Sequence, residues 1–217
     1  NDQHIEPAVI KSASPPARPA TIQDNDAAIF FDFREDSPRQ LTHAFLDESF
    51  DKFPRKKINN LYFVAMTQYY PELRPENVAF LPPDISNTLA EVLSAYGKKQ
   101  LHVAETEKYA HATYFFNGLL EKAFPGEDRI VIPSNRGAPH EEHPEMKAEE
   151  ITSAVIENFD KFDFCLINFA NADMLGHTGN MQAVIAGVEA VDRCIARLLA
   201  IQGDDMAIII SADHGNA

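Results

Sequence analysis

Two short segments of this sequence place an aspartate beside a histidine, and each segment directly follows an apolar run. The pairs are Asp173 with His177 and Asp213 with His214. The preceding runs, 162–167 and 206–210, have the composition of buried strands. If both runs belong to one parallel sheet, their carboxyl ends lie at the same edge, where open α/β sheets bind ligands. Carboxylate and imidazole together suit Zn²⁺ or Mn²⁺. The two pairs therefore predict a mononuclear or dinuclear metal site.

Each pair taken alone has a simpler explanation. An isolated Asp-x-x-x-His is more often a helix-capping aspartate followed by a solvent-facing histidine, because short motifs match by chance. Asp-His-Gly is also ordinary turn chemistry. Gly176 and Gly179 allow the backbone to approach a ligand closely, and Gly215 gives the second pair the irregular backbone that adjacent ligands need. A metal needs more ligands than one pair supplies, so we expect the others to come from outside this sequence.

Two basic residues are candidate anion-binding groups. Arg34 directly follows an apolar run, and it could be a salt-bridged surface residue or a clamp for phosphate or carboxylate. The spacing leaves both explanations open. Lys108 has Glu105 three residues before it, so its default explanation is an ion pair on a solvated helix face. His111 is by default a surface or half-buried histidine.

Composition narrows the class of protein. The chain has 217 residues, 45% of them apolar, which supports a substantial core and argues against global disorder. Its formal net charge of −14 argues against non-specific nucleic-acid binding. An anionic substrate must then be attracted by local Arg, Lys or metal charge. Cys165 and Cys194 are expected to be buried, reduced thiols. No signal peptide or apolar run long enough for a membrane is present, so we expect a cytoplasmic enzyme.

The order of patterns along the chain predicts an α/β fold. From residue 84 onward helices and strands alternate, which predicts a parallel sheet covered by helices on both faces. Pro82-Pro83-Asp84 is the expected domain boundary, since two prolines continue neither a strand nor a helix. Thr88 and Glu91 fit a capping box. The expected strands are 27–33, 61–66, 78–81, 100–104, 129–132, 162–169 and 206–211. The expected helices are 39–50, 88–96, 105–122, 148–159 and 181–200.

Two of these elements carry a specific burial prediction. The runs 164–167 and 207–210 are continuously apolar, which is typical of central strands buried on both faces. The helix 181–200 has one apolar stripe that should cover the sheet. The stripe consists of Val184, Val188, Val191, Ile195 and Leu198.

Seven stretches, which together run through nearly the whole chain in order, resemble one known family. They are 29–34, 78–83, 104–111, 124–130, 168–179, 188–192 and 212–217. The runs Glu-Thr-Glu-Lys-Tyr-Ala-His and Asn-x-Asp-Met-x-Gly-His-x-Gly are the most specific of them. The sequence thus resembles the cofactor-independent (2,3-bisphosphoglycerate-independent) phosphoglycerate mutases of the alkaline phosphatase superfamily.

The resemblance implies a reaction and a role for each candidate residue. The family interconverts 3-phosphoglycerate and 2-phosphoglycerate in glycolysis and gluconeogenesis, using two Mn²⁺ ions (Co, Zn or Mg in some members) that activate a serine. By resemblance Asp173 and His177 would ligate one ion, and Asp213 and His214 the other. Arg34 would hold the substrate. Lys108 would lie near the transferring phosphoryl group, where positive charge is stabilising.

The sequence also departs from the family pattern. The family's second arginine falls at Ser37, and Arg39 could replace it. The loop 134–140 differs from the usual Ser-Pro-Lys-Val run. The family's N-terminal half, with the nucleophilic serine, is absent, as is the last histidine ligand.

We therefore expect a fragment that is inactive alone. Residues 1–82 would be the end of a phosphotransferase domain, and residues 83–217 most of an alkaline-phosphatase-like, doubly wound, mainly parallel domain. The expected partner is a small phosphoglycerate, with neither nucleic acid nor membrane, and the complete protein would be a monomer. The alternatives are another metal-dependent phosphatase or phosphomutase of the superfamily, or a non-catalytic remnant of the fold.

Overall fold

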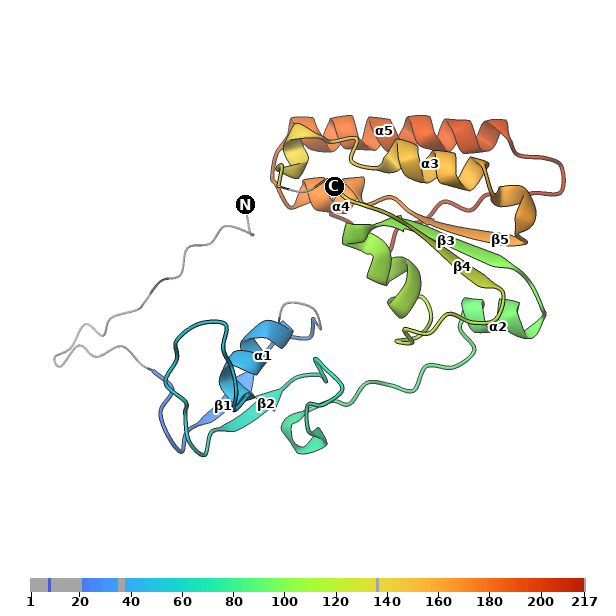
Figure 1. Ribbon diagram of the computed structural model, residues 1–217. Coiled ribbons are helices and arrows are strands. Elements are labelled where there is room, and N and C mark those ends of the chain that lie inside the picture. Colours follow the sequence, from blue (N-terminus) through green and yellow to red (C-terminus); the bar gives the residue numbers. More distant parts are fainter. Residues whose placement is uncertain (1–7, 9–20, 35–37, 136, 217) are drawn as a thin grey trace. The chain divides into compact units, whose positions relative to one another are not determined.

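The computed structural model describes Ala8 and residues 21–34, 38–135 and 137–216 (Figure 1). The chain divides into two compact units, with the division between Asp84 and Ile85. This position lies at the Pro82-Pro83-Asp84 segment where the sequence predicts a boundary. Each unit is described below by itself.

The first unit is built on two parallel strands and one helix. Strand β1 (Ala27–Phe30) pairs with β2 (Tyr62–Ala65), and helix α1 (Pro38–Leu46) lies between them in the chain. A short 3₁₀ helix follows at Pro75–Asn77. The core contains Phe63, Ala65, Tyr69 and Leu73.

Three predictions for this unit need correction. Strand β1 ends at Phe30, not Phe33, because the Tyr69 hydroxyl donates to the backbone oxygens of Phe30 and Asp32 where a ladder would continue. Helix α1 ends at Leu46, four residues earlier than Phe50. Residues 78–81 form only an isolated parallel bridge between Val78 and Ala65. An apolar run predicts burial, but a strand also needs a continuous partner.

The second unit is a three-stranded parallel sheet with helices on both faces. Strand β3 (Gln100–Glu105) lies in the centre, between β4 (Glu127–Ile132) and β5 (Phe164–Asn168). Helices α3 (Ala148–Ile156) and α5 (Met181–Ala200) lie on one face of the sheet in Figure 1. Helix α2 (Leu89–Ala95) lies on the opposite face, so the predicted two-sided cover is confirmed.

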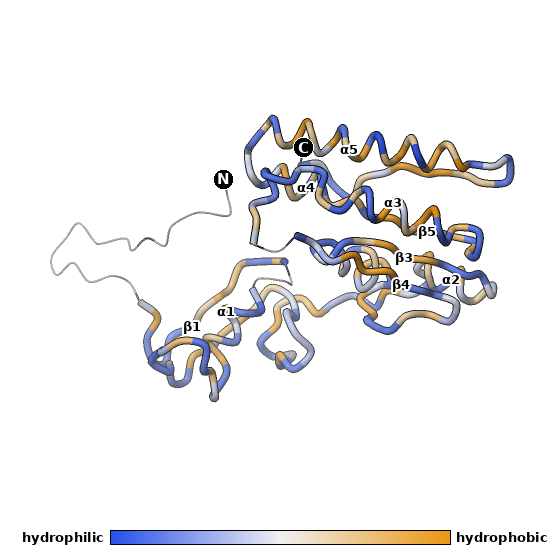
Figure 2. Tube along the Cα trace, turned by 45° about the horizontal axis from the view of Figure 1, so that its top comes forward, coloured by the Kyte–Doolittle hydropathy of each residue, from blue (hydrophilic) through white to orange (hydrophobic). Residues whose placement is uncertain are grey.

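The main core of this unit lies between the sheet and helices α3 and α5. Its fully buried members are Leu101, Val103, Ile151, Val155 and Leu198. In Figure 2 hydrophobic positions lie on the strands and on α5, and in both they are interrupted by hydrophilic ones. Burial of these apolar side chains is the main free-energy term that holds the unit together.

Local sequence signals explain where the helices begin. Thr88 caps α2 by accepting a hydrogen bond from the Glu91 amide at 3.2 Å. Glu91 in turn accepts from the Asn87 amide at 2.6 Å, one residue earlier than an ideal capping box. The Asn180 side chain caps α5 by accepting from the amides of Gln182 and Ala183. Helix α5 has the predicted bounds.

The predicted helix 105–122 is confirmed only for its first half, and that half is irregular. The chain forms a 3₁₀ turn at Thr106–Lys108, α-helical residues at 109–110 and a π-helical segment at His111–Phe115, followed by turns. The Thr113 hydroxyl donates to the backbone oxygen of Tyr109 at 2.7 Å, a side-chain bond that competes with regular helix bonding.

One strand prediction fails, and one prediction about the burial of a strand fails. Residues 206–211 form no strand, and Ile209 and Ile210 are 90% and 65% exposed, although Ile208 packs against the main core. Strand β5 is a strand as predicted, but within the described chain it lies at the edge of the sheet, and each of its residues is only half-buried. Apolar runs alone do not identify which strand is central.

The predicted stripe on α5 is displaced around the helix. Val188 is 46% exposed, and the buried face contains Leu198 together with small residues. These small residues are Ala183, Gly187, Ala190 and Cys194. A Cβ on Gly187 would overlap the Leu175 side chain of α4 (Asn171–Gly176), so close helix packing selects small residues over large ones.

The remaining expectations are simpler to assess. Both cysteines are free thiols, with Cys194 buried and Cys165 half-buried. None of the helices in the described part of the chain is long and apolar enough to cross a bilayer.

Candidate functional site

The parallel sheet brings two segments together that are distant in the sequence. Strands β3 and β5 are neighbours, so their carboxyl ends lie at one edge of the sheet. The 3₁₀ turn Thr106–Lys108 follows β3, and helix α4 follows β5 after a short connection. Lys108 and Asp173 meet at this edge, 65 residues apart in the chain.

Lys108 and Asp173 form a mostly buried ion pair. The Lys108 ammonium donates to Asp173 Oδ2, and the side chains are 8% and 15% exposed. The default explanation of Lys108, a solvated pair with Glu105, is therefore wrong. Glu105 is fully buried and accepts a hydrogen bond from the Ser134 hydroxyl instead. Sequence spacing gives no signal for the partner of Lys108, because it depends on the strand order.

Two imidazoles approach the other oxygen of the same carboxylate. His177 Nε2 lies 3.3 Å from Asp173 Oδ1, one helical turn away. His214 Nε2 lies 3.9 Å from this oxygen. Asp173 is thus the shared centre of a lysine and two histidines, and the structure brings four predicted site residues together: Lys108, Asp173, His177 and His214.

Asn216 is a member of the site that the sequence analysis missed. Its amide nitrogen donates to Asp173 Oδ1 at 2.8 Å and to the Asp173 backbone oxygen at 3.0 Å. Gly176 makes this contact possible, because a Cβ there would overlap the Asn216 backbone oxygen. The glycine thus permits close approach of the chain's own backbone. The only available signal was the position of Asn216 directly after the second Asp-His pair.

The surroundings of Asp173 favour its charged form. Partial burial by itself would raise the pKa of this carboxyl. Hydrogen bonds from Lys108 and Asn216, and the charges of Lys108 and His177, outweigh burial and hold the pKa below its ordinary value of 3.8. Asp173 is therefore an anion at neutral pH, as a metal ligand or a partner of an ammonium must be.

Asp213 lies at the exposed side of the site. Its side chain is 58% exposed, and its Oδ1 accepts a hydrogen bond from the backbone amide of His214 at 3.0 Å. Its Oδ2 lies 3.7 Å from His214 Nε2. The second predicted pair is therefore local, and His214 connects it to Asp173.

The donor atoms fit a divalent cation in kind but not in number. A carboxylate with two imidazoles is the mixed ligand set that Mn²⁺ and Zn²⁺ accept. Among the described residues, however, no group of three or more His, Cys, Asp or Glu side chains is arranged to hold an ion. Since a metal site needs more ligands than a pair, these residues supply at most part of one.

The two predicted substrate-binding arginines belong to the first unit. Arg34 and Arg39 are both exposed. Ser37, which marks the expected second arginine position, lies outside the described residues. His111 is half-buried, and its ring contacts that of Phe115 at a centroid distance of 5.3 Å.

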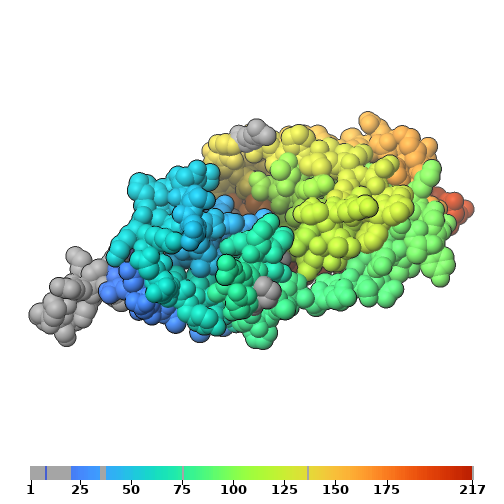
Figure 3. All heavy atoms as spheres, turned by 60° about the horizontal axis from the view of Figure 1, so that its bottom comes forward, coloured from blue at the N-terminus to red at the C-terminus, as the bar shows by residue number. Residues whose placement is uncertain are grey.

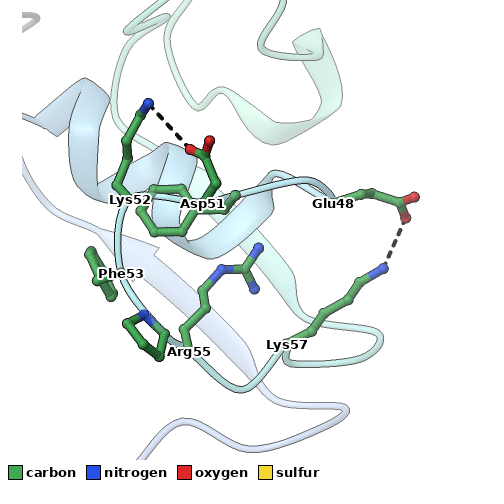
Figure 4. Close-up of a pocket in the computed structure, with 8 residues that line it drawn as sticks. Glu48, Asp51, Lys52, Phe53, Arg55 and Lys57 are labelled. Carbon is green, nitrogen blue, oxygen red and sulfur yellow. Dashed lines mark hydrogen bonds and ion pairs between the residues drawn. The ribbon is translucent and has the colours of Figure 1, made fainter.

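A surface hollow of about 470 Å³ lies in the first unit and contains none of these predicted residues. It is formed by residues 48–57, in the cyan part of the surface in Figure 3. Figure 4 shows two ion pairs at this hollow, Lys52–Asp51 at 3.2 Å and Lys57–Glu48 at 2.9 Å. Arg55 lies over the Phe50 ring, with 5.5 Å to its centroid. Both lysines that line the hollow, Lys52 and Lys57, are therefore already paired with carboxylates.

Comparison with known families decides the class of this site. A model described as the metalloenzyme superfamily matches residues 37–217, and these contain the lysine, both aspartates and both histidines. The chain belongs to the metalloenzyme superfamily. A second model, the BPG-independent PGAM N-terminus, matches residues 1–71. The alkaline-phosphatase-like α/β fold class predicted from the sequence is thereby confirmed.

Comparison with individual proteins identifies the family within this superfamily. The chain is 49% identical over 218 residues to the 2,3-bisphosphoglycerate-independent phosphoglycerate mutase of Moorella thermoacetica, covering 100% of this chain and 42% of the relative. The enzyme of that name from Synechococcus sp. strain JA-3-3Ab is 50% identical over 94% of this chain and 39% of the relative. The predicted family resemblance is confirmed, and the chain spans about two fifths of these relatives.

A solved structure shares the fold. The Leishmania mexicana phosphoglycerate mutase, determined at low cobalt concentration, matches with a TM-score of 0.69 and 36% identity. The match covers 85% of this chain and 35% of the solved one. It supports the α/β assignment for most of the chain.

Proposed function

We propose that the complete gene product interconverts 3-phosphoglycerate and 2-phosphoglycerate by metal-dependent phosphoryl transfer. One observation carries the proposal: a mostly buried lysine ammonium is paired with a carboxylate that two imidazoles also approach. The similarity to named phosphoglycerate mutases supplies the substrate. Because the chain spans only part of these relatives, we assign the activity to the complete gene product.

The residues of the chain divide the work by charge. Asp173 and His177 would hold one divalent ion, and Asp213 and His214 a second, with Mn²⁺ preferred and Co²⁺, Zn²⁺ or Mg²⁺ as alternatives. When bound, such ions activate an attacking oxygen and neutralise phosphoryl charge. Lys108 places its ammonium where negative charge on the transferring group is stabilised.

The wider assignment follows from the same relationship. Arg34 and Arg39 would bind the substrate, since guanidinium binds carboxylate and phosphate bidentately. Residues 1–82 would belong to the phosphotransferase domain and 83–217 to the metal-binding domain. A serine outside this sequence would carry the phosphoryl group between the two hydroxyls. We further propose a cytoplasmic monomer that acts in glycolysis and gluconeogenesis.

Metal content and mutase turnover of the complete gene product test the proposal. The decisive variant is Asp173→Ala with His214→Ala, and the matched control is Asp192→Ala with His143→Ala, at exposed or half-buried positions outside the site. We expect bound Mn²⁺ and turnover in the wild type and the control, and the loss of both in the site variant. Turnover that survives the site variant would show that these loops are structural.

The 217-residue chain alone should have no mutase turnover in a coupled assay with added Mn²⁺. By the family resemblance, the nucleophilic serine would lie outside this sequence. Turnover by this chain would contradict the assignment of the nucleophile to another segment.

A further inference from the structure

A buried carboxyl group lies three residues before Lys108. Glu105 is the last residue of β3, and its side chain is fully buried. Its Oε2 accepts a hydrogen bond from the Ser134 hydroxyl at 2.9 Å. Burial raises the pKa of the Glu105 carboxyl, against the Ser134 hydrogen bond, which lowers it. Burying a carboxyl costs free energy that an apolar residue of similar size would not cost. The position of Glu105 is therefore better explained by its hydrogen bond than by packing.

Ser134 connects this carboxyl to the turn that carries Lys108. Its hydroxyl oxygen also accepts a hydrogen bond from the backbone amide of Glu107 at 3.2 Å. The Ser134 amide donates to the Thr106 hydroxyl at 3.3 Å, and that hydroxyl donates to the Ile132 backbone oxygen at 3.4 Å. These bonds join the end of β3, the 3₁₀ turn and the end of β4.

The turn determines where the Lys108 side chain lies. The residues Thr106–Lys108 form one turn of 3₁₀ helix, which has no side-chain cap of its own. Thr106 and Glu107 are both bonded to Ser134, and Lys108 follows directly with its ammonium on Asp173. A displacement of this turn would therefore move the ammonium away from the carboxylate.

We propose that Glu105 and Ser134 are positioning residues, which hold the 106–108 turn so that Lys108 reaches Asp173. The importance of this position for catalysis rests on the proposed mutase function. The effect acts through geometry, since these hydrogen bonds join Glu105 to Ser134 and Ser134 to residues 106 and 107, and none of them involves the Lys108 or Asp173 side chain. The role requires a hydrogen-bond acceptor at residue 105 and a hydroxyl at residue 134, and it requires no charge at residue 105.

Amine labelling of Lys108 in the complete gene product tests the proposal directly. At one fixed pH, acetylation of each lysine is followed by mass spectrometry, and alkylation of the buried Cys194 thiol reports unfolding of the unit. In Ser134→Ala and Glu105→Ala we expect Lys108 to label about two- to tenfold faster, as the loss of one hydrogen bond predicts. Cys194 should remain as protected as in the wild type.

Two further variants separate positioning from general support. Glu105→Gln keeps an acceptor and should label at the wild-type rate, and it also serves if Glu105→Ala does not fold. Ser94→Ala is the matched control, because it removes one serine hydroxyl bonded to the Pro125 backbone oxygen at 2.8 Å in the same unit. It should leave Lys108 labelling unchanged.

Three results would overturn the positioning role of Glu105 and Ser134. Unchanged Lys108 labelling in Ser134→Ala, or equal increases for Lys108 and Cys194, would overturn the positioning role. So would a Glu105→Gln protein that labels as fast as Glu105→Ala. Turnover provides an independent comparison, since Ser134→Ala should lower kcat more than it changes KM. If the wild type lacked mutase turnover, the proposed function would fail, while the labelling result would still decide the positioning role.

Discussion

The Lys108–Asp173 pair is better explained by charge placement than by stability. Both side chains are mostly buried. Removing two charges from water offsets much of their attraction, and apolar replacements of such pairs are often neutral or stabilising. Two imidazoles also lie within 4 Å of the Asp173 carboxylate. A buried ammonium beside a carboxylate places positive charge where it can stabilise negative charge that develops on a reacting group.

Gly176 should be essential for the joint between the two Asp-His loops. In Gly176→Ala, the new Cβ would displace Asn216 and remove its hydrogen bonds to Asp173. Loss of a bond that orients a metal ligand typically weakens metal binding about 10- to 100-fold. We expect a change of this size for Mn²⁺ in the complete gene product, measured by titration calorimetry.

Gly215→Ala is the control for this substitution. Gly215 lies in the same loop as Asn216, but it does not adopt the left-handed backbone conformation that requires glycine. Among the described residues, no atom beyond its chain neighbours lies within 4 Å of a Cβ at that position. Its Mn²⁺ affinity should therefore match the wild type. Equal affinities in all three proteins would show that the Asn216 contact does not orient Asp173.

At the scale of elements, the segment after β3 is helical but irregular. It passes from a 3₁₀ turn into π-helical residues His111–Phe115. π-Helical turns occur frequently at functional sites. Here the irregular segment begins with the turn that presents Lys108, so its geometry serves the site more than local helix propensity. The sequence pattern of 105–122 is helical, but side-chain hydrogen bonds compete with regular helix bonding, both local, from Thr113 to Tyr109, and distant, from the Glu107 amide to Ser134.

A second buried polar cluster joins β3 and β4 and predicts a pH-dependent stability. His102 is 1% exposed; its Nε2 lies 3.1 Å from Gln100 Oε1, and its Nδ1 lies 3.6 Å from Glu127 Oε1. Burial lowers the pKa of His102 below its ordinary value of 6.5, although the Glu127 charge opposes this shift and the Arg129 charge adds to it. The folded unit therefore holds this imidazole neutral.

The sign of the pH effect follows from this neutral imidazole. Below pH 6.5 the unfolded chain binds a proton that the folded His102 binds less well, so stability falls as the pH falls. The slope for one such group is at most about 1.4 kcal/mol per pH unit. The free energy of unfolding can be measured in urea at about pH 5.5 and about pH 7.5. Its difference between the two pH values should be smaller for His102→Gln than for the wild type.

Two buried carboxyl groups could also change stability with pH, but neither accounts for a difference between wild type and His102→Gln in this pH range. Burial by itself would raise the pKa of Glu127, but hydrogen bonds from Phe124, Arg129 and Asn117 hold this pKa below its ordinary value of 4.5. The contribution of Glu127 to stability is therefore lost only in stronger acid. Burial raises the pKa of Glu105, so its contribution to stability falls as the pH rises, opposite to that of His102. Glu105 is present in both wild type and His102→Gln, so its contribution cancels in the comparison. Identical pH differences in wild type and His102→Gln would show that His102 is not the responsible group.

Sequence patterns predicted the parts of the molecule that local rules determine. The bounds of α5 and the capping of α2 by Thr88 follow from side-chain chemistry within a few residues. The strand predicted from the apolar run 206–210 was wrong, because a strand forms only beside a partner strand and the run itself does not specify one. The predicted α5 stripe is right for Leu198 but wrong for Val188, because close packing on α4 places Gly187 and other small residues on the buried face.

The candidate site shows the same division. The two Asp-His pairs were visible because their types and spacing are local. The partner of Lys108 depends on the strand order β4-β3-β5, and the role of Asn216 depends on how the last loop folds onto α4. Neither contact has a sequence period. The resemblance to a known family placed Lys108 near the chemistry, whereas spacing alone placed it on a solvated face.

At the scale of the whole molecule, the segment that joins the two units should be the first site of proteolysis. Leu81 is 59% exposed, and among the described residues no backbone-to-backbone hydrogen bond involves 81–86. Exposed segments without backbone hydrogen bonds open most easily. Limited thermolysin digestion, which cuts before large apolar residues, should therefore first cleave the Phe80–Leu81 bond and release a folded product that begins at Leu81. Mass spectrometry identifies the product, and Leu81→Ser, which removes the preferred residue, should slow its formation. First cleavage within β3, β4 or β5 would contradict the division into two compact units, because those strands supply or adjoin the core of the second unit.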